Sequence, residues 1–520
     1  MREYWLFAAG GTGRRVALAM LHMCAAGALA GDRLHIRYAD TDDEESEECD
    51  WFVTLKQQFE LYKNLHEIFK DDGKLFSCEI NYPIDYETPE YITPEGVEVP
   101  KEIHKDEARQ DWIGEIIGIS SKEKESTIQS VYNGLHSFEE RLLIQALLGK
   151  ENTTNIKPFW GLCAAPNVGA LLLKSRIQDN DALKNFFGLD PESLMRNAEA
   201  RLKNARGKKE EEKAKYELER AKAYKEKKYK NEYEYNKDHP IAFAASSFGG
   251  TGAAFVPAVR QHLNVIEKTP SRCAMLFLDQ HFKISPRWTE DIFDEKRPAM
   301  KKFLEDHHAG EFYILDTKVE DIKTRGKDED KGQKNWPSKT ECLATILLCA
   351  FFTEGNFGWK TANPETENNG DFPNLRDRYE AFNKLALSWC ADFEGSQMKC
   401  EKTGKVKWHP GAAWTGRIPK RKDEFLLFRR IKTKADSEYA TLEDETLKNF
   451  LIGWLRWRQQ IDGEYAEDGG SLTIEPTSKD EIAAAVECWY TANTKLNHTK
   501  AQLFNELFEV CMALQEKGEK

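Results

Sequence analysis

Two glycine-rich turns, more than two hundred residues apart, carry the residue types best suited to hold an anion. The first reads AAGGTGRR over residues 8–15, and the second reads SSFGGTGAA over residues 246–254. Each turn follows a short apolar run typical of a buried strand and begins a helical pattern. Backbone N–H groups in such a turn and at a helix N-terminus converge on one anion. Two such turns predict a polyphosphate that is bound from two sides.

The glycines of both turns permit close backbone approach and unusual φ angles. Thr251 adds a hydroxyl donor, and the arginines of the first turn could reach phosphate or stack on a base. The competing interpretation is that the turns only join strands tightly to helices. The residues predicted to bind nucleotide here are Gly10, Gly11, Thr12, Gly13, Arg14, Arg15, Gly249, Gly250, Thr251 and Gly252.

Two further loops contain polar residues that could serve the same ligand. Asp40, Thr41 and Asp42 follow an apolar run, and Asp42 could hold Mg²⁺ directly or through water. Aspartates at such positions also cap helices, which is the alternative interpretation of Asp42. The third loop contains Ala165, Pro166 and Asn167, which follow another apolar run and precede a helix start.

The elements that must position these loops alternate between short apolar runs and helical patterns. This alternation predicts an α/β fold with a mostly parallel sheet and helices on both faces. Because ligands bind at the carboxyl ends of the strands in such sheets, the loops are expected to lie together. Strands are predicted at residues 4–9, 34–39, 159–165, 240–245, 273–279 and 312–316, and helices at 16–29, 255–266, 298–307 and 342–352.

The chain is long enough for two or three domains. We assign residues 1–376 to a nucleotide-binding domain and residues 377–520 to a mainly helical, Trp-rich C-terminal domain. Segment 192–238 is dominated by Lys, Arg, Glu and Ala and predicts a charged helical insertion that projects from the body. It could bind nucleic acid or an acidic partner, but a solvated helix with i,i+4 ion pairs is favoured.

Composition excludes several classes of function. The net charge of −13 disfavours nonspecific nucleic-acid binding by the whole molecule. No apolar stretch is long enough to span a bilayer, and a strand so near the N-terminus leaves no room for a signal peptide. The eleven cysteines are scattered without a CxxC pair, so neither zinc nor a disulfide framework is indicated. We therefore expect a cytoplasmic protein with reduced thiols.

Taken in order, the loops resemble the nucleotide-binding loops of the tubulin/FtsZ family. The DTD loop that begins at Asp40 resembles the family's Asn-Thr-Asp turn, and CAAPNVG over residues 163–169 resembles its third loop. FGGTGAAFVP over residues 248–257 resembles its most specific motif, and NGDFPNLR over residues 369–376 resembles its catalytic loop. The resemblance covers roughly residues 1–380 and does not extend to the last 140.

The resemblance implies a GTPase with GTP or GDP and Mg²⁺ as ligands. In this family the acid that activates water comes from the next subunit, so hydrolysis is completed by self-assembly into filaments. The resemblance gives Asp371 that role, while Asn374 stands where the family has a second acid and can orient water without accepting its proton. Asp377 lies one helical turn further and could substitute. Alternatively, residues 369–371 form only a turn with an N-cap.

Base recognition departs from the family pattern. Arg15 occupies the position of the family's base-contacting Asn, and Glu341 matches the family's second base-reading acid only loosely. GTP is therefore implied by the resemblance, while ATP or a signalling nucleotide stays open.

Two other functions remain open from the residues alone. A Rossmann-type NAD(P)-dependent enzyme is supported by the first glycine turn and by Asp40 at the end of the second strand. However, the first turn lacks the full GxGxxG spacing, and the second turn has no role in that scheme. A non-catalytic nucleotide-dependent scaffold or sensor is supported by the missing second acid. The charged segment 192–238 and the C-terminal region would then offer surfaces to a protein partner.

Overall fold

The computed structural model of the 520-residue chain describes a central body and several isolated positions. The described residues are 1–40, 55–72, 74–81, 235–247, 250–265, 269–280, 312–317, 337, 339–354, 373–390, 397–399, 406–408 and 445–461, with isolated residues between 127 and 222 and between 504 and 512.

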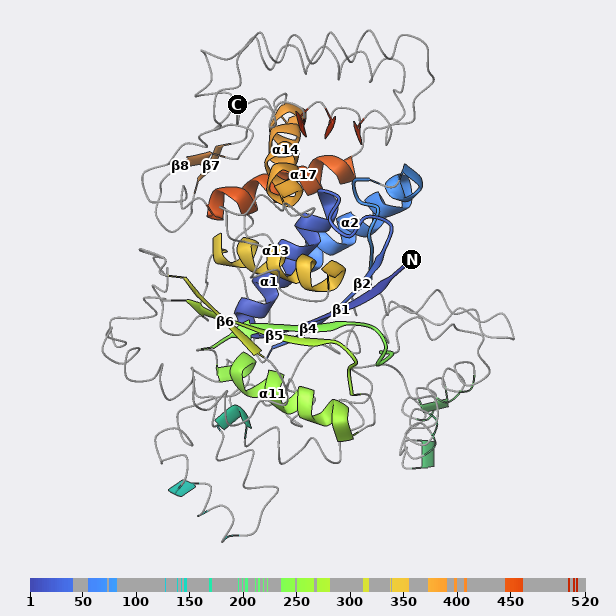
Figure 1. The fold of residues 1–520 in the computed structure, drawn as a ribbon, viewed down its shortest axis with the longest axis vertical. Helices are drawn as coiled ribbons and strands as arrows, with labels where there is room; N and C mark the ends of the chain where they lie inside the picture. Colours follow the sequence, from blue (N-terminus) through green and yellow to red (C-terminus); the bar gives the residue numbers. More distant parts are fainter. Residues whose placement is uncertain are drawn as a thin grey trace.

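Within the described residues, six strands form one parallel sheet in the order β3-β2-β1-β4-β5-β6 (Figure 1). The predicted α/β class is therefore confirmed. Because β1 lies beside β4, the chain reverses its winding direction between these two strands, which is the topological switch point of such a sheet. The strands are β1 (Glu3–Ala9), β2 (Arg33–Ala39), β3 (Glu79–Asn81), β4 (Ile241–Ser246), β5 (Cys273–Gln280) and β6 (Phe312–Thr317).

The two faces of the sheet are covered by different helices. Helices α1 (Gly10–Ala25) and α13 (Lys339–Glu354) lie on one face, and α11 (Gly250–Val265) lies on the other (Figure 1). Alternate residues of β1 contact the two layers. Tyr4 stacks on Phe352 of α13 with ring centroids 5.1 Å apart, whereas Phe7 stacks on Phe255 of α11 at 5.3 Å. Strands buried on both faces explain the nearly continuous apolar runs in the sequence.

A second helical layer covers α1 on the side away from the sheet. It contains α2 (Leu55–Phe69), which continues into the 3₁₀ turn η2 (Lys70–Asp72), together with α14 (Pro373–Cys390) and α17 (Glu445–Ile461). An aromatic cluster joins this layer to α1. Its centre is Trp454, whose ring lies 4.6 Å from Phe382 and 5.2 Å from His22. Burial of each large apolar side chain stabilises the fold by about 2 kcal/mol.

The C-terminal helices therefore share one hydrophobic cluster with the helices and strands of residues 1–376. Helix α14 also runs continuously across the predicted domain boundary after residue 376. The division into two domains stays a prediction. The described C-terminal residues also include a short antiparallel ribbon, β7 (Gln397–Lys399) and β8 (Val406–Trp408).

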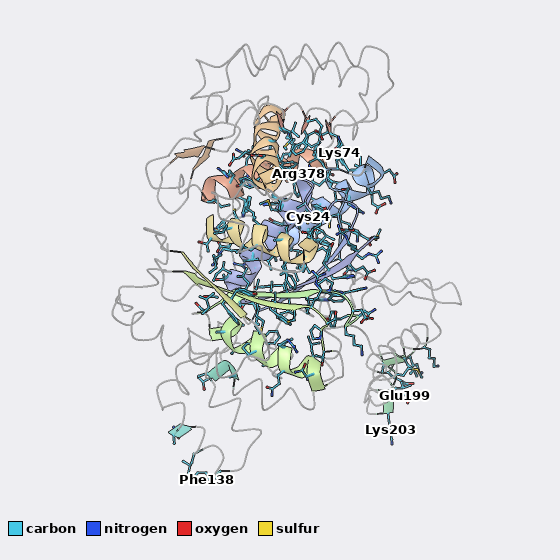
Figure 2. All side chains as sticks on the ribbon, viewed as in Figure 1. Cys24, Lys74, Phe138, Glu199, Lys203 and Arg378 are labelled. Atoms are coloured by element: carbon cyan, nitrogen blue, oxygen red, sulfur yellow. The ribbon has the colours of Figure 1, made fainter. Side chains whose placement is uncertain are left out.

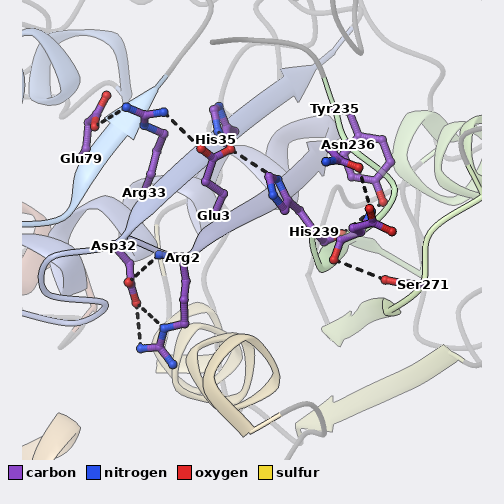
Figure 3. Close-up of polar contacts among 11 residues, drawn as sticks. Arg2, Glu3, Asp32, Arg33, His35, Glu79, Tyr235, Asn236, His239 and Ser271 are labelled. Carbon is purple, nitrogen blue, oxygen red and sulfur yellow. Dashed lines mark hydrogen bonds and ion pairs between the residues drawn. The ribbon is translucent and has the colours of Figure 1, made fainter. Parts of the chain in front are cut away.

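Charged side chains connect the amino ends of three neighbouring strands (Figure 3). Glu3 lies 3.3 Å from both His35 and His239, and Arg33 bridges Glu3 and Glu79. The hydrogen bond with His35 lowers the pKa of Glu3 to about 2, while burial lowers the pKa of His35 to about 4. All six strands run in the same direction, and the glycine turns follow the carboxyl ends of β1 and β4. This network, at the amino ends of the strands, therefore lies on the opposite side of the sheet from the turns.

The charged segment 192–238 is described only at isolated positions. Those between residues 195 and 222 are helical, and Lys215 Nζ lies 2.6 Å from Glu211 Oε1 across one helical turn. The prediction of exposed i,i+4 ion pairs is confirmed at this position. Such a pair contributes only about 0.3–0.5 kcal/mol.

Candidate phosphate-binding site

The two glycine turns lie side by side. Ala9 at the end of β1 is in register with Ala245 of β4, so the turns that follow begin at the same level of the sheet. A Cβ atom placed on Gly10 would lie 3.4 Å from the backbone nitrogen of Gly252 and 3.6 Å from Cβ of Thr251. Segments separated by more than two hundred residues therefore form one surface at the switch point of the sheet.

Glycine is required in both turns for steric reasons. Gly10 has a φ of +71°, in the left-handed region that other residues rarely adopt. A Cβ atom on Gly13 would lie 2.8 Å from the carbonyl oxygen of Ala244, and one on Gly252 would lie 2.7 Å from Cβ of Ala245. These glycines allow α1 and α11 to sit directly on the small alanines at the strand ends. The helices consequently begin inside the turns, earlier than the apolar pattern predicts.

Both helices present their positive N-terminal ends at this surface. Neither α1 nor α11 has an acidic residue in its first turn, and Ala9 caps α1 without a side-chain hydrogen bond. The first N–H groups of a helix have no partner within the helix, and its dipole favours an anion by roughly 0.3–1 kcal/mol. Arg14, which is half-buried, adds a positive charge to the first turn. This arrangement suits a group with several negative oxygens.

The structure brings Arg15 and Glu341 together, although 326 positions separate them in the chain. Arg15 Nε donates to Glu341 Oε1 at 2.8 Å, and Arg15 Nη2 donates to Thr12 Oγ1 at 2.9 Å. The side chains of Arg15 and Glu341 are 4% and 0% exposed. The first turn of α13 is thereby joined to the first glycine turn. Thr251 is likewise buried at the start of α11.

Asp40 lies at the same edge of the sheet, directly after β2. The Tyr38 hydroxyl donates to Asp40 Oδ2 at 2.9 Å, and Asp40 is buried. Because Ala39 is in register with Ala9, this carboxylate belongs to the loop beside the first glycine turn. Five other predicted nucleotide-binding loop residues and one glycine lie outside the described residues: Thr41, Asp42, Ala165, Pro166, Asn167 and Gly249. Residues 168–170 are helical, as expected after the third loop.

The two predicted catalytic residues that the structure describes, Asn374 and Asp377, belong to α14. Asp371 is outside the described residues, Asn374 is in the first turn of α14, and Asp377 is half-buried in the same helix. The neighbouring Arg378 donates through Nε to the carbonyl oxygen of Ala26, just beyond the C-terminal end of α1. The 16 residues of α1 span about 24 Å. Asp377 therefore lies near the end of α1 that is opposite the glycine turns.

Sequence reasoning missed two residues that position the site. Tyr38 donates a hydrogen bond to Asp40. The spacing in the sequence could have indicated this contact, because residues two apart on a strand point to the same side. Arg378, which Figure 2 labels, fixes α14 to the end of α1. Its guanidinium carbon lies over the Phe508 ring, 5.3 Å from the ring centroid. These contacts join segments 130 and 352 positions apart, so no local pattern could reveal them.

Comparisons with known proteins add no family. No family model, curated protein or solved structure matches this chain. In the part of the chain that the structure describes, no helix is long and apolar enough to cross a membrane, and no group of three or more His, Cys, Asp or Glu side chains is placed to hold a metal ion.

Proposed function

We propose that this chain binds the polyphosphate of a nucleoside triphosphate between its two glycine turns. The observation that carries the proposal is the close approach of Gly10 to Gly252, at the start of two helices on opposite faces of the sheet: a Cβ atom on Gly10 would lie 3.4 Å from the Gly252 backbone nitrogen. Two helix N-termini that meet at one point supply many N–H donors without any charged side chain. A single phosphate could use one turn, but a chain of phosphates can use both.

The resemblance of the loops to the tubulin/FtsZ family supports GTP and Mg²⁺ as the ligands. Asp42 would hold the ion, because it lies two residues beyond Asp40 in the loop that follows β2. Carboxylate oxygens are ligands that Mg²⁺ prefers, and the ion would neutralise charge that develops on the phosphates. The proposed reaction is hydrolysis of a phosphoanhydride bond of the nucleotide. The chain would position the phosphates and stabilise their negative charge.

The position of α14 supports a site that two subunits complete. Asp377 and the first turn of α14 lie near the far end of α1, about 24 Å from the turns of the same chain. A water-activating acid at that end cannot act on a phosphate held by its own glycine turns. In a head-to-tail assembly it would meet the phosphate of a neighbour, and repeated head-to-tail contacts generate filaments. We therefore propose a GTPase whose hydrolysis depends on self-assembly.

A dinucleotide-dependent enzyme is the second candidate. The strand order 3-2-1-4-5-6 and an acidic residue at the end of β2 are both features of NAD(P)-binding folds. In that scheme Asp40 would bind the ribose hydroxyls with the acceptor sites that Tyr38 does not use. The contact between the two glycine turns favours the triphosphate, because a dinucleotide uses only the first turn.

Competition binding distinguishes these functions. A fluorescent GTP analogue is titrated with purified chain and Mg²⁺, and is then displaced by GTP, ATP, NAD, NADP or inorganic triphosphate. We expect displacement by GTP and by inorganic triphosphate. Displacement by NAD or NADP alone would establish the dinucleotide function, and no binding of GTP or GDP would refute the proposal.

Hydrolysis is tested separately from binding. Single-turnover rates are compared between the wild-type chain and Asp371→Ala, below and above the concentration at which particles appear by electron microscopy. A GTPase completed by assembly hydrolyses faster above that concentration, and the variant loses this increase. Equal and negligible hydrolysis by both, with binding intact, would identify a nucleotide-dependent scaffold or sensor instead.

A further inference from the structure

The Arg15 guanidinium connects two parts of the candidate site, the first turn of α13 and the first glycine turn. Its Nε donates to Glu341 in the first turn of α13, and its Nη2 donates to Thr12 within the first glycine turn. Its Nη1 lies 3.8 Å from the point that a Cβ atom on Gly11 would occupy, so the guanidinium lies beside the first glycine turn. At least two of its nitrogens donate to protein side chains, one in α13 and one in the turn.

Helix α13 is held at both ends by arginine. Arg15 holds its first turn, and Arg272 Nη2 donates to the carbonyl oxygens of Phe351 and Phe352 in its last turn, at 2.7 and 3.3 Å. Between these ends, α13 packs on α1, where Cys349 Sγ lies 3.8 Å from Met20 Sδ. The body of α13 is therefore held by its packing on α1, and Arg15 separately joins its first turn to the glycine turn.

The burial of the ion pair argues against direct contact with a base. A side chain that reads a base must present its polar edge to the ligand, but Glu341 is 0% exposed and Arg15 is 4% exposed. If either one left its partner to contact a ligand, an unpaired charge would remain in the interior, which is strongly unfavourable. A planar guanidinium that donates in several directions is well suited to hold a turn in one shape.

We propose that Arg15 and Glu341 are positioning residues that fix the first glycine turn for polyphosphate binding, whatever base the nucleotide carries. This inference rests on the proposed nucleotide-binding function. It assigns to both residues a role that does not depend on guanine. Selectivity between GTP and ATP must then come from other parts of the chain.

The test uses Glu341→Gln, which keeps an oxygen acceptor but removes the charge, and Arg15→Lys, which removes the planar fork. The double variant Arg15→Met/Glu341→Met replaces the buried pair with apolar side chains of similar size, so that the fold tolerates the loss of both charges. Arg272→Met is the matched control, because it releases the far end of α13 without touching the turn. Dissociation constants for GTP, ATP and inorganic triphosphate, each with Mg²⁺, are measured well below the melting temperature of every variant.

We expect the single and double variants to bind all three ligands roughly tenfold more weakly, which corresponds to about 1.4 kcal/mol. The ratio of the GTP and ATP constants stays unchanged, and Arg272→Met binds as the wild-type chain does even where its melting temperature falls. A loss for GTP with unchanged binding of inorganic triphosphate would show that the pair reads the base and would overturn the inference. Unchanged binding of all three ligands by folded variants would overturn it as well. A wild-type chain that binds none of the three refutes the proposed function itself, and the inference with it.

Discussion

Two glycines with nearly the same positive φ, Gly10 and Gly31, allow an effect on folding to be distinguished from an effect on ligand binding. Gly10 has a φ of +71° and lies in the first turn, whereas Gly31 has a φ of +75° and precedes β2 at the opposite edge of the sheet. Replacement of either by alanine costs roughly 1–2 kcal/mol for the left-handed backbone. Alanine also reduces the conformational entropy of the unfolded chain, which offsets about 0.4–1 kcal/mol of this cost. Both variants should therefore lose about 1 kcal/mol of folding free energy.

The two variants should differ in nucleotide binding. The new methyl group of Gly10→Ala lies 3.4 Å from the backbone nitrogen of Gly252 and shields that donor from an anion, while the methyl group of Gly31→Ala has no neighbour within 4 Å. Loss of one hydrogen bond to a charged group costs about 1.5–3 kcal/mol. Gly10→Ala should thus bind GTP roughly 10- to 100-fold more weakly.

The assay combines urea denaturation, which gives the free energy of unfolding, with titration calorimetry for GTP and Mg²⁺. Similar losses of stability and a selective loss of affinity in Gly10→Ala are the expected results. The reasoning fails if Gly10→Ala binds GTP as tightly as Gly31→Ala does, because the two turns would then not share the phosphate.

Three further predictions concern the structure that holds the site. Replacing Arg378 with Met removes the hydrogen bond to the carbonyl after α1 and should lower the free energy of unfolding by about 2 kcal/mol in urea denaturation. Gly453→Ala places a methyl group on the buried amide of Gln58 and should break its hydrogen bond with His22 at a cost of about 1–3 kcal/mol, while alanine in the middle of α17 returns about 1 kcal/mol, so the same denaturation experiment should show a net loss of up to about 2 kcal/mol. Stability should fall as the pH is lowered. The pKa of His35 is depressed to about 4, so the unfolded chain gains a proton first below about pH 6.5, and Glu3, depressed to about 2, adds a further loss below about pH 4.5. A denaturation midpoint that rises as the pH is lowered from 7 to 4 would contradict this prediction.

Much of the sheet could be predicted from the sequence because of how it is buried. The runs 4–9 and 240–245 are apolar at every position, as parallel strands covered on both faces require, and the structure confirms them as β1 and β4. Strand β3 escaped prediction because its three residues are too few to show a period. The helix starts were placed too late because Gly10 and Gly250 interrupt the apolar pattern but belong to the helices.

The site could be predicted only in part. The spacing of the glycines predicted both turns, because a strand–turn–helix junction depends on the backbone conformation of a few consecutive residues. The pairing of Arg15 with Glu341 depends on the packing of α13 against α1, which no local pattern encodes. The same limit applies to α17, whose apolar residues predicted a helix but not its contact with His22 of α1. The role of Asp371 stays a prediction, since it lies outside the described residues.

The claim that two turns hold one polyphosphate is tested most directly by a structure of the chain determined with Mg²⁺ and a slowly hydrolysed GTP analogue. We predict phosphate oxygens within hydrogen-bond distance of backbone N–H groups from both turns, near Gly11 and near Gly252. A nucleotide that contacts only the first turn, or that binds away from the carboxyl edge of β1 and β4, would contradict the claim.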